Sequence, residues 1–296
     1  MIEKKKIYFI VNPISGVGKQ NMIEKIIPEF LDLGKYDYTL SYTKAQGHAT
    51  ELSKKAVESN NYDIIVIVGG DGSINEVAKG MVGTDIPLGI IPTGSGNGLA
   101  NFLNIPFNFK RAINIINTGI TKTIDTATIN DENLFISIAG VGFDALVARE
   151  FSKVKKRGFW SYFNIVAREY PKYKPREYII EINGQVIKTE ALFISFANSN
   201  QFGFNATIAP SASISDGLID VCIFKKASII EAPILAHFLF FRLIDETRYV
   251  EIIRATEFKI IQPQNNYIHI DGEPLKLSRE LNVKINPLSL RVIVPK

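Results

Sequence analysis

Residues 64–73 read IIVIVGGDGS, and this stretch decides the fold of the N-terminal part of the chain. Its first five residues are apolar and β-branched without interruption, a pattern expected for a parallel strand that is covered on both faces. Two glycines and an aspartate follow at once, and a helical pattern begins at Ser73. A buried strand, a glycine-rich loop and a helix in this order predict one unit of a doubly wound α/β sheet.

The same alternation of strand and helix continues on both sides of this stretch. Further strands are predicted over residues 7–11, 38–42 and 88–91. Helices are predicted over residues 21–33, 48–59 and 73–81, with further helical segments beginning near residues 97 and 110. Repeated strand–helix units indicate a parallel sheet of the doubly wound type.

After about residue 121, strand-like runs replace this alternation. They are predicted over residues 121–130, 134–139, 178–182, 191–197, 219–224, 257–261, 267–270 and 281–285. The pairs Asn183-Gly184 and Asp271-Gly272 favour hairpin turns between them. We therefore expect a second, antiparallel β-rich, sandwich-like domain with a few helices, and an active site in the cleft between the two domains.

Composition argues against several classes of protein. Hydrophobic residues make up 46% and charged residues 22% of the 296 residues, an ordinary globular balance. One cysteine, Cys222, and three histidines without zinc-ligand spacing argue against a disulfide and a zinc site. The apolar runs 7–11 and 229–244 fall short of a signal peptide and a transmembrane helix, so the expected compartment is the cytoplasm. A net charge of +4 does not demand nucleic acid as a partner.

Positive charge is concentrated in residues 153–176, where basic and aromatic side chains are interleaved and Glu169 is the single acid. This mixture suits an anionic membrane surface, and we expect a transient, peripheral association with the inner face of the membrane. The alternative is a solvated helix whose aromatic side chains point into a core. The basic residues are Lys153, Lys155, Lys156, Arg157, Arg168, Lys172, Lys174 and Arg176.

Glycine-rich loops follow three predicted strands, at residues 12–19 (NPISGVGK), 69–73 (GGDGS) and 92–98 (PTGSGNG). The carboxyl ends of parallel strands meet at one edge of a sheet, so we expect these loops to lie together where ligands bind. A triphosphate needs backbone N–H groups and helix N-termini that no side chain obstructs. Together the loops predict a nucleotide-phosphate site. Hydroxyls that can donate to phosphate are Ser15, Ser73, Thr93 and Ser95.

Each loop also has a purely structural explanation. Gly16 and Gly18 can make a tight turn, Asp71 can be a turn residue, and Ser73 and Glu76 have the spacing of a helix capping box. A P-loop is excluded by the residues at positions 13 and 20, and the partial dinucleotide fingerprint at 140–145 lacks a following strand that ends in an acid.

In order and spacing, these loops resemble the catalytic domain of the diacylglycerol kinase family, which includes bacterial soluble lipid kinases, sphingosine kinases and ceramide kinases. The resemblance covers nearly the whole chain. It implies an ATP-binding α/β domain over residues 1–124, completed by a returning strand at 288–296, and a lipid-substrate domain over 125–287. The matching motifs are NPISG (12–16), GGDGS (69–73), PTGSGN (92–97), GFDA (142–145), APSA (209–212), DGLID (216–220) and DGEP (271–274).

The resemblance also implies roles for individual residues. The Asp216 side chain and the backbone oxygens of Ser213 and Leu218 look like ligands of Mg²⁺. The residues that look like ATP contacts are Asn12, Pro13, Ile14, Ser15, Gly16, Thr43, Gly70, Asp71, Gly72, Ser73, Ile74, Asn75, Glu76 and Ser95.

Three acids are candidate catalytic residues. Phosphoryl transfer requires positioning, Mg²⁺ to offset phosphate charge and a carboxylate to accept the hydroxyl proton. We expect Glu273 to be this base, with Asp271 and Asp71 holding metal or substrate. Asp71 resembles the aspartate assigned as base in sphingosine kinases. The alternative for Asp271-Gly272 is a type I′ hairpin turn.

The acceptor is expected to be a membrane lipid, with diacylglycerol, which would give phosphatidic acid, ahead of other hydroxyls. The third loop motif, PTGSGN (92–97), continues as Asn97-Gly98-Leu99-Ala100. This continuation is closer to that of sphingosine and ceramide kinases than to that of many bacterial diacylglycerol kinases. A sphingoid-base kinase is therefore an alternative, and Asp144 would then face the substrate amine unless it caps the following helix. A kinase of a soluble substrate and an inactive lipid- or nucleotide-binding regulator are further alternatives. An exposed edge strand would support a homodimer.

Overall fold

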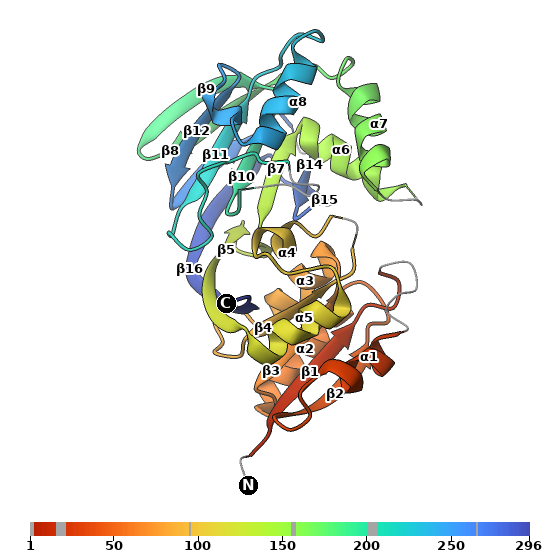
Figure 1. The fold of residues 1–296 in the computed structure, drawn as a ribbon. Coiled ribbons are helices and arrows are strands. Elements are labelled where there is room, and N and C mark those ends of the chain that lie inside the picture. The colour runs from red at the N-terminus through yellow and green to blue at the C-terminus, as the bar shows by residue number, and fades with distance from the viewer. Residues whose placement is uncertain (1–2, 16–21, 95, 155–157, 201–205, 265) are drawn as a thin grey trace. The chain divides into compact units, whose positions relative to one another are not determined.

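The computed structural model describes the chain apart from residues 1–2, 16–21, 95, 155–157, 201–205 and 265. Its chain divides into two compact units (Figure 1). The N-terminal unit contains Met1–Ile124 and Leu288–Lys296, and the C-terminal unit contains Asp125–Pro287. The first unit is α/β and the second is mainly β.

The N-terminal unit is built on a parallel sheet of β1 (Lys5–Val11), β2 (Tyr36–Tyr42), β3 (Ile64–Gly69), β4 (Leu88–Pro92) and the last part of β16 (Glu280–Val294). The strand order is β2-β1-β3-β4-β16. Val66 in β3 pairs with Phe9 in β1 and Gly89 in β4, so the carboxyl ends of these strands lie at one edge. All residues of β3 are buried, as expected for a strand covered on both faces.

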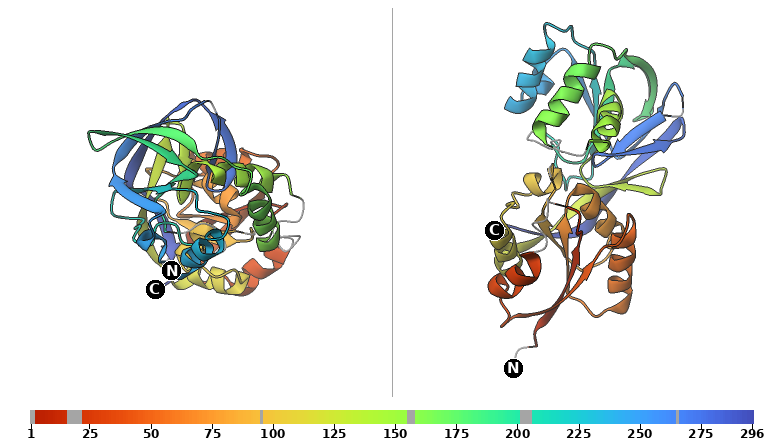
Figure 2. Two further views of the ribbon diagram at one scale, coloured as in Figure 1. Left: turned by 90° about the horizontal axis from the view of Figure 1, so that it is seen from above. Right: turned by 90° about the vertical axis from the view of Figure 1, so that its right-hand side faces the viewer.

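Helices cover both faces of this sheet (Figure 2). Phe9 and Val66 belong to one buried cluster with α1 (Ile23–Phe30) and α5 (Phe109–Thr118). Side chains alternate between faces along a strand. The equally buried Ile10 and Ile67 therefore face the side of α2 (His48–Ser59) and α3 (Asp71–Lys79). A short helix, α4 (Gly98–Phe102), follows β4.

The C-terminal unit is a sandwich of two largely antiparallel sheets. The first contains the beginning of β16 with β13 (Glu257–Ile261), β8 (Arg176–Ile182) and β9 (Gln185–Ala191), together with β5 (Ile120–Ile129) and β6 (Asn133–Phe135). The second has the order β12-β11-β10-β7-β14-β15. Its strands are β12 (Val250–Ala255), β11 (Ile219–Phe224), β10 (Phe193–Ala197), β7 (Ile138–Gly142), β14 (Asn266–Ile270) and β15 (Glu273–Leu277).

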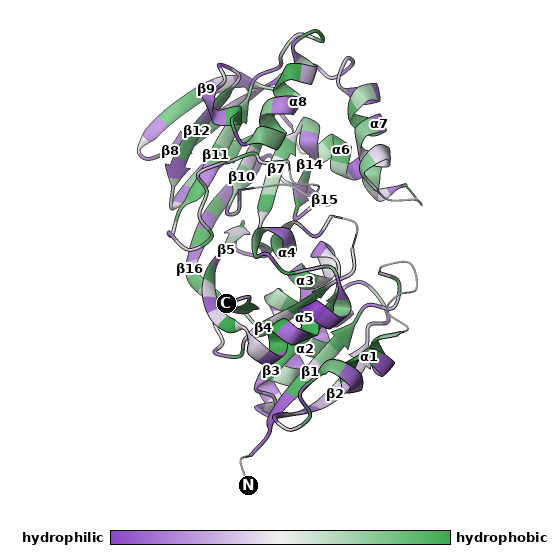
Figure 3. Ribbon diagram, viewed as in Figure 1, coloured by the Kyte–Doolittle hydropathy of each residue, from purple (hydrophilic) through white to green (hydrophobic). Residues whose placement is uncertain are grey.

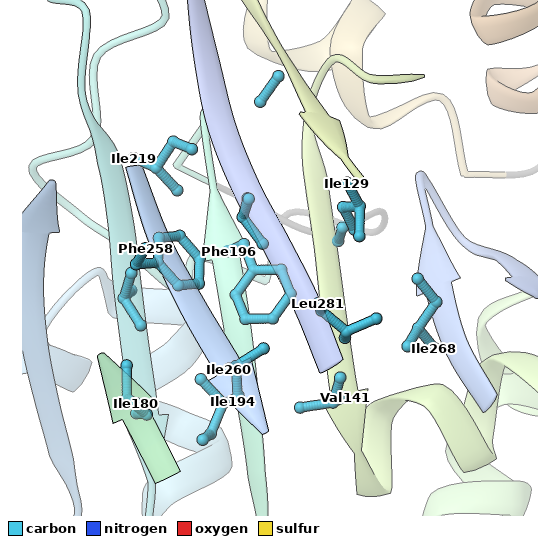
Figure 4. Packing of buried hydrophobic residues seen from close by; sticks show 14 of the residues in the cluster. Ile129, Val141, Ile180, Ile194, Phe196, Ile219, Phe258, Ile260, Ile268 and Leu281 are labelled. Carbon is cyan, nitrogen blue, oxygen red and sulfur yellow. The ribbon is translucent and has the colours of Figure 1, made fainter. Parts of the chain in front are cut away.

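Figure 4 shows the apolar layer between these two sheets. Phe196 of the second sheet contacts Phe258 of the first, with ring centroids 5.0 Å apart. Both rings belong to a cluster that is drawn from both sheets. Burial of apolar area in this layer is the main favourable term that holds the sandwich together.

Helices cover the other face of the second sheet. They are α6 (Phe143–Ser152), α7 (Phe159–Glu169), α8 (Ala232–Phe241) and the short η3 (Ile244–Glu246). Cys222 lies under α8 in a buried apolar cluster, and burial raises the pKa of its thiol well above the ordinary value. The prediction of an α/β domain followed by an antiparallel, sandwich-like β domain is confirmed.

Several strands differ from the prediction, and the edge strands β12 and β15 were not predicted. The single strand expected over 134–139 is two strands, β6 and β7, because the N–H groups between them bind a carboxylate, that of Asp271. The runs 281–285 and 289–294 form one strand, β16, with Leu288 at a φ of 45° inside it. Strand β9 was not predicted, since it is largely polar and lies at an edge of its sheet.

Candidate active site

Hydrogen bonds between side chains join the three glycine-rich loops of the N-terminal unit. Asn12, after β1, donates from Nδ2 to Ser73 Oγ in α3 at 2.8 Å. Ser15 Oγ lies 2.7 Å from Thr93 Oγ1, after β4. Thr93 N in turn donates to the Gly69 carbonyl at 2.9 Å. The loops that follow β1, β3 and β4 therefore form one continuous polar edge.

Two of the glycines are required by close packing at this edge. A Cβ on Gly94 would lie 2.7 Å from Gly70 Cα, and a Cβ on Gly69 would lie 2.6 Å from Ser73 Cβ. Both distances are shorter than real Cβ contacts allow. The absence of a side chain at Gly94 lets the β3 and β4 loops touch, and its absence at Gly69 leaves room for Ser73 in the first turn of α3.

The N-terminus of α3 points at this edge without a capping side chain. Its N-cap is Gly70, and the first turn contains Asp71, Gly72 and Ser73. The capping box of Ser73 and Glu76, the structural alternative suggested by their spacing, does not form. Ser73 accepts from Asn12, and Glu76 Oε1 accepts from Gly47 N at 2.8 Å, so both partners are distant in sequence. Backbone N–H groups at an uncapped helix N-terminus favour an anion.

The remaining predicted ATP contacts lie around the same edge. Asn12 Oδ1 accepts from Ile14 N at 3.1 Å, and Pro13 completes this turn. Thr43 N donates to the Val11 carbonyl, which places Thr43 just beyond β2. Ile74 and Asn75 are 1% and 6% exposed. Gly16 and Ser95 lie outside the described residues.

A groove of about 700 Å³ lies beside Thr43. Its lining includes Tyr38, Tyr42, Lys44 and His48, and Tyr42 donates to Glu24 Oε1 at 2.8 Å. The groove combines aromatic ring surface with a few polar groups, including Lys44 and Glu24, as small-molecule sites commonly do. Sequence reasoning missed it, since β2 carries no glycine-rich motif.

The C-terminal unit contains two of the three acidic candidates, Asp271 and Glu273, whereas Asp71 lies in the N-terminal unit. Asp271 and Gly272 have φ angles of 46° and 84° and join the paired residues Ile270 and Glu273, as in a type I′ turn. The hairpin turn suggested by the sequence is confirmed. Glu273 is exposed at the first position of β15.

Asp271 has a second structural task. Its Oδ1 accepts from Ser137 N at 2.8 Å and Ile138 N at 3.2 Å, and its Oδ2 accepts from Ile136 N at 3.0 Å. Three backbone donors thus fix the carboxylate and tie the hairpin to the segment between β6 and β7. Of the two acids, Glu273 is exposed and Asp271 is partly buried.

Asp144 is buried among polar partners. It lies in the first turn of α6, is 8% exposed, and its Oδ2 is 3.0 Å from both Ser195 Oγ and His269 Nε2. A Cβ on Gly140 would lie 2.6 Å from the same oxygen, which explains the first glycine of the apparent dinucleotide fingerprint. Asp144 also accepts from Ala145 N with Oδ1 at 2.7 Å.

The loop around Asp216 contains the three residues that were predicted to hold Mg²⁺. Asp216 is exposed, and its Oδ1 accepts from Leu218 N at 3.1 Å. Gly217 N donates to Asp125 Oδ2 at 2.8 Å, which holds the turn in place. One carboxylate with the carbonyls of Ser213 and Leu218 suits Mg²⁺, which keeps several waters and takes few protein ligands. Among the described residues no cluster of three acidic, histidine or cysteine side chains forms an all-protein metal cage.

Two buried acids beneath this loop were not singled out from the sequence. Asp220 pairs with Arg254 at 3.0 Å, and Arg254 also donates to the Ser211 carbonyl. Burial raises the pKa of Asp220, and the guanidinium of Arg254 opposes this. Asp125 is completely buried. From the sequence alone, neither acid can be told apart from an ordinary strand residue, because its partners are distant in the chain.

Comparisons with known proteins agree with this geometry. Residues 6–129 match the diacylglycerol kinase catalytic domain, and residues 137–294 match the YegS C-terminal NAD kinase beta sandwich-like domain. A diacylglycerol kinase of Bacillus subtilis (strain 168) is 30% identical over 277 residues, covering 91% of this chain and 90% of that protein. A diacylglycerol kinase of Mycobacterium tuberculosis (strain H37Rv) is 27% identical over 98% of this chain and 96% of that protein.

A solved structure from Bacillus anthracis str. Sterne has the same fold. It superposes with a TM-score of 0.81 at 22% identity, over 99% of this chain and 98% of that one.

Proposed function

Because this chain belongs to the diacylglycerol kinase family and is a lipid kinase that uses ATP, we propose that it phosphorylates the free hydroxyl of diacylglycerol and yields phosphatidic acid. The observation that carries this proposal is the bonded edge of three loops around the uncapped N-terminus of α3. Such an edge supplies N–H groups for the phosphates of ATP.

In the proposed mechanism, the N-terminal unit binds ATP. The β and γ phosphates face the N-terminus of α3, where Gly72 and Ser73 present N–H groups and Asp71 adds a carboxylate to the first turn. Asn12 and Ser15 fix the neighbouring loop, and the groove beside Thr43 receives the base and ribose. Rigid positioning of the phosphates is the main contribution of such a site to phosphoryl transfer.

Glu273 is proposed as the base that takes the hydroxyl proton of the acceptor. Its carboxylate is exposed, whereas that of the neighbouring Asp271 is held by three backbone N–H groups. Asp271 is thus assigned to positioning the hairpin that presents Glu273. Asp216 with the Ser213 and Leu218 carbonyls would hold Mg²⁺, which when bound would offset negative charge on the phosphates.

A sphingoid base is the second candidate acceptor, favoured by the sequence Asn97-Gly98-Leu99-Ala100. Burial of Asp144 weighs against it. Asp144 is only 8% exposed, and its oxygens already have Ala145 N, Ser195 Oγ and His269 Nε2 as partners, so a substrate amine would have to reach a buried carboxylate. Diacylglycerol carries no amine, so its binding does not require contact with Asp144.

Phosphate transfer from labelled ATP in mixed micelles with Mg²⁺ tests the proposal. Diacylglycerol, a sphingoid base, ceramide and a micelle without lipid acceptor run in parallel. We expect labelled phosphatidic acid and only background with the other acceptors. Labelled sphingoid-base phosphate alone would overturn the diacylglycerol assignment. Protection of the chain by ATP against unfolding, with no lipid product, would favour a soluble acceptor or a regulator.

A further inference from the structure

Helix α8 is apolar over almost all of its length (Figure 3), and its one polar residue, His237, is exposed beside Phe241. Its outward side chains Ile234, Phe240 and Phe241 are 57%, 45% and 61% exposed. No residue of this ten-residue helix is buried. A helix that is apolar all round is normally enclosed by protein or membrane. The residues that pack inward, spaced i, i+3 and i+4, are Leu235, Phe238 and Leu239.

The exposed apolar surface extends along the chain on both sides of α8. Ile229 and Ile230 precede the helix and are 65% and 86% exposed, and Leu243 follows it at 39%. Exposed apolar residues normally occur singly on a soluble protein, and a contiguous patch marks an interaction site.

Helix α7 continues this surface. Its outward side chains Phe159, Trp160 and Phe163 are 38%, 73% and 49% exposed. The ring of Phe159 lies 6.4 Å from that of Phe240, which joins α7 to α8 within the C-terminal unit. Trp160 and Phe163 also contact each other, with centroids 6.2 Å apart. We call these outward residues of α7, α8 and the Ile229-Ile230 loop the α7–α8 surface.

Basic side chains flank the α7–α8 surface. Lys172 and Lys174 follow α7, and Arg242 ends α8; all three are exposed and form no ion pair within the part of the chain that the structure describes. Two ion pairs also lie in this part of the chain, Arg168 with Glu169 and Arg248 with Glu231. Asp245 and Glu246 lie beyond α8, in the short helix η3. Segment 153–176 as a whole remains strongly basic.

We infer that the α7–α8 surface docks on an anionic lipid bilayer, with its aromatic and aliphatic side chains in the headgroup–acyl boundary and Lys172, Lys174 and Arg242 at the phosphate level. Tryptophan, phenylalanine and aliphatic residues bordered by Lys and Arg are the composition of interfacial helices. At ten residues, α8 is about 15 Å long, half of the hydrocarbon thickness, so it lies in the interface rather than across it. No helix among the described residues is long and apolar enough to span a membrane.

This inference rests on the proposed function for its purpose, since a lipid acceptor resides in a bilayer, but its test requires neither ATP nor turnover. Trp160 is the single tryptophan of the chain and lies in the α7–α8 surface, so its fluorescence reports on docking directly. The full chain is mixed with vesicles of phosphatidylglycerol and phosphatidylcholine. We expect a blue shift of the emission and quenching by lipids brominated on the acyl chain. Co-sedimentation with vesicles while the emission stays unchanged would overturn the assignment.

Two double variants distinguish docking through this surface from nonspecific hydrophobic binding to vesicles. Ile234→Ser with Phe241→Ser removes two outward side chains of α8. Val186→Ser with Phe107→Ser removes two equally exposed apolar side chains, 65% and 51%, on β9 and in the N-terminal unit. We expect the α8 pair to weaken vesicle binding about tenfold or more, from the apolar area lost, and the control pair to leave it unchanged. Equal effects of the two pairs would contradict the inference.

Activity on a water-soluble, short-chain diacylglycerol keeps the two proposals distinguishable. The α8 pair should retain this activity and lose activity on vesicles. Docking without phosphorylation of any acceptor would reject the proposed function and leave the inference intact. Phosphorylation of vesicle lipid that the α8 pair does not reduce would reject the inference alone. The chain could instead self-associate in the absence of lipid as its concentration rises. If the α8 pair abolished that self-association, the surface would be assigned to a second copy of the chain.

Discussion

At the scale of single residues, the acids of the hairpin between β14 and β15 divide into two kinds. Asp271 accepts three backbone N–H groups, and Glu273 is exposed two residues later. The sequence pattern Asp-Gly-Glu could not distinguish these tasks, because the donors to Asp271 come from residues 136–138, far away in the chain. Stability and catalysis should therefore respond differently to changes at the two positions.

Glu273→Gln keeps the size of the side chain and removes the proton acceptor. We expect kcat to fall roughly a hundredfold or more while the affinity for ATP stays the same, since a general base contributes to the chemical step and not to nucleotide binding. Steady-state kinetics with diacylglycerol in micelles measures both. Glu257→Gln, another exposed glutamate of the C-terminal unit, is the control and should keep full activity. An unchanged kcat in Glu273→Gln would exclude Glu273 as the base.

Asp271→Ala should lower the free energy of unfolding by about 2 kcal/mol, because partly buried backbone donors lose a charged acceptor. Asn183→Ala is the matched control, since Asn183 occupies the same left-handed position, with a φ of 51°, in the hairpin between β8 and β9. Its loss should be smaller, about 1 kcal/mol. Urea unfolding measures both variants. Equal losses would mean that Asp271 acts only through its turn geometry.

At the scale of elements, the local sequence pattern predicted where strands and loops lie better than it predicted which residues their side chains bind. Apolar runs located β3, β4 and β11 because strands covered on both faces have a continuous apolar signature. The capping box failed because Ser73 and Glu76 bind residues that are 61 and 29 positions away. The edge strand β9, with few buried residues, left no periodic signal. Local spacing thus predicts an element, and the fold decides what its polar side chains bind.

The contact between the β3 and β4 loops can be tested by adding a single methyl group. Gly94→Ala would place a Cβ 2.7 Å from Gly70 Cα, and the loops would have to separate. We expect ATP affinity to fall about tenfold and stability to fall by about 1–3 kcal/mol, the usual cost of overpacking. Gly158→Ala, where no atom lies within 4 Å of the added Cβ, should change neither. Calorimetric titration measures ATP affinity. Normal ATP binding by Gly94→Ala would show that the close contact between the β3 and β4 loops is not needed for the nucleotide site.

At the scale of the whole molecule, the N-terminal unit depends on the other end of the chain. Its last strand is the end of β16, where Val292 pairs with Leu88 of β4, and Gly83 N donates to the Ser289 carbonyl. The two-domain order and the antiparallel character of the second domain could be predicted from the sequence. That residues 280–294 form one continuous strand could not, because Pro287 and Leu288 look like a break.

Removal of residues 288–296 should therefore abolish ATP binding although it removes none of the proposed ATP contacts. The truncation exposes β4, a fully buried strand, as a sheet edge and takes Leu290 and Val292 out of the core. Protection by ATP in thermal unfolding measures the effect. Removal of residues 1–3, which precede β1, is the control and should leave protection unchanged. Full protection of the longer truncation would show that β4 does not need β16.

The position of β16 also sets the order in which a ribosome can complete this enzyme. Domains generally fold as they emerge, N-terminal first. Here the sheet that supports the nucleotide loops is closed by residues 288–294, so the first unit stays unfinished until the second has been translated. A nascent or prematurely terminated chain would then contain all three proposed phosphate-binding loops, and we expect it not to consume ATP.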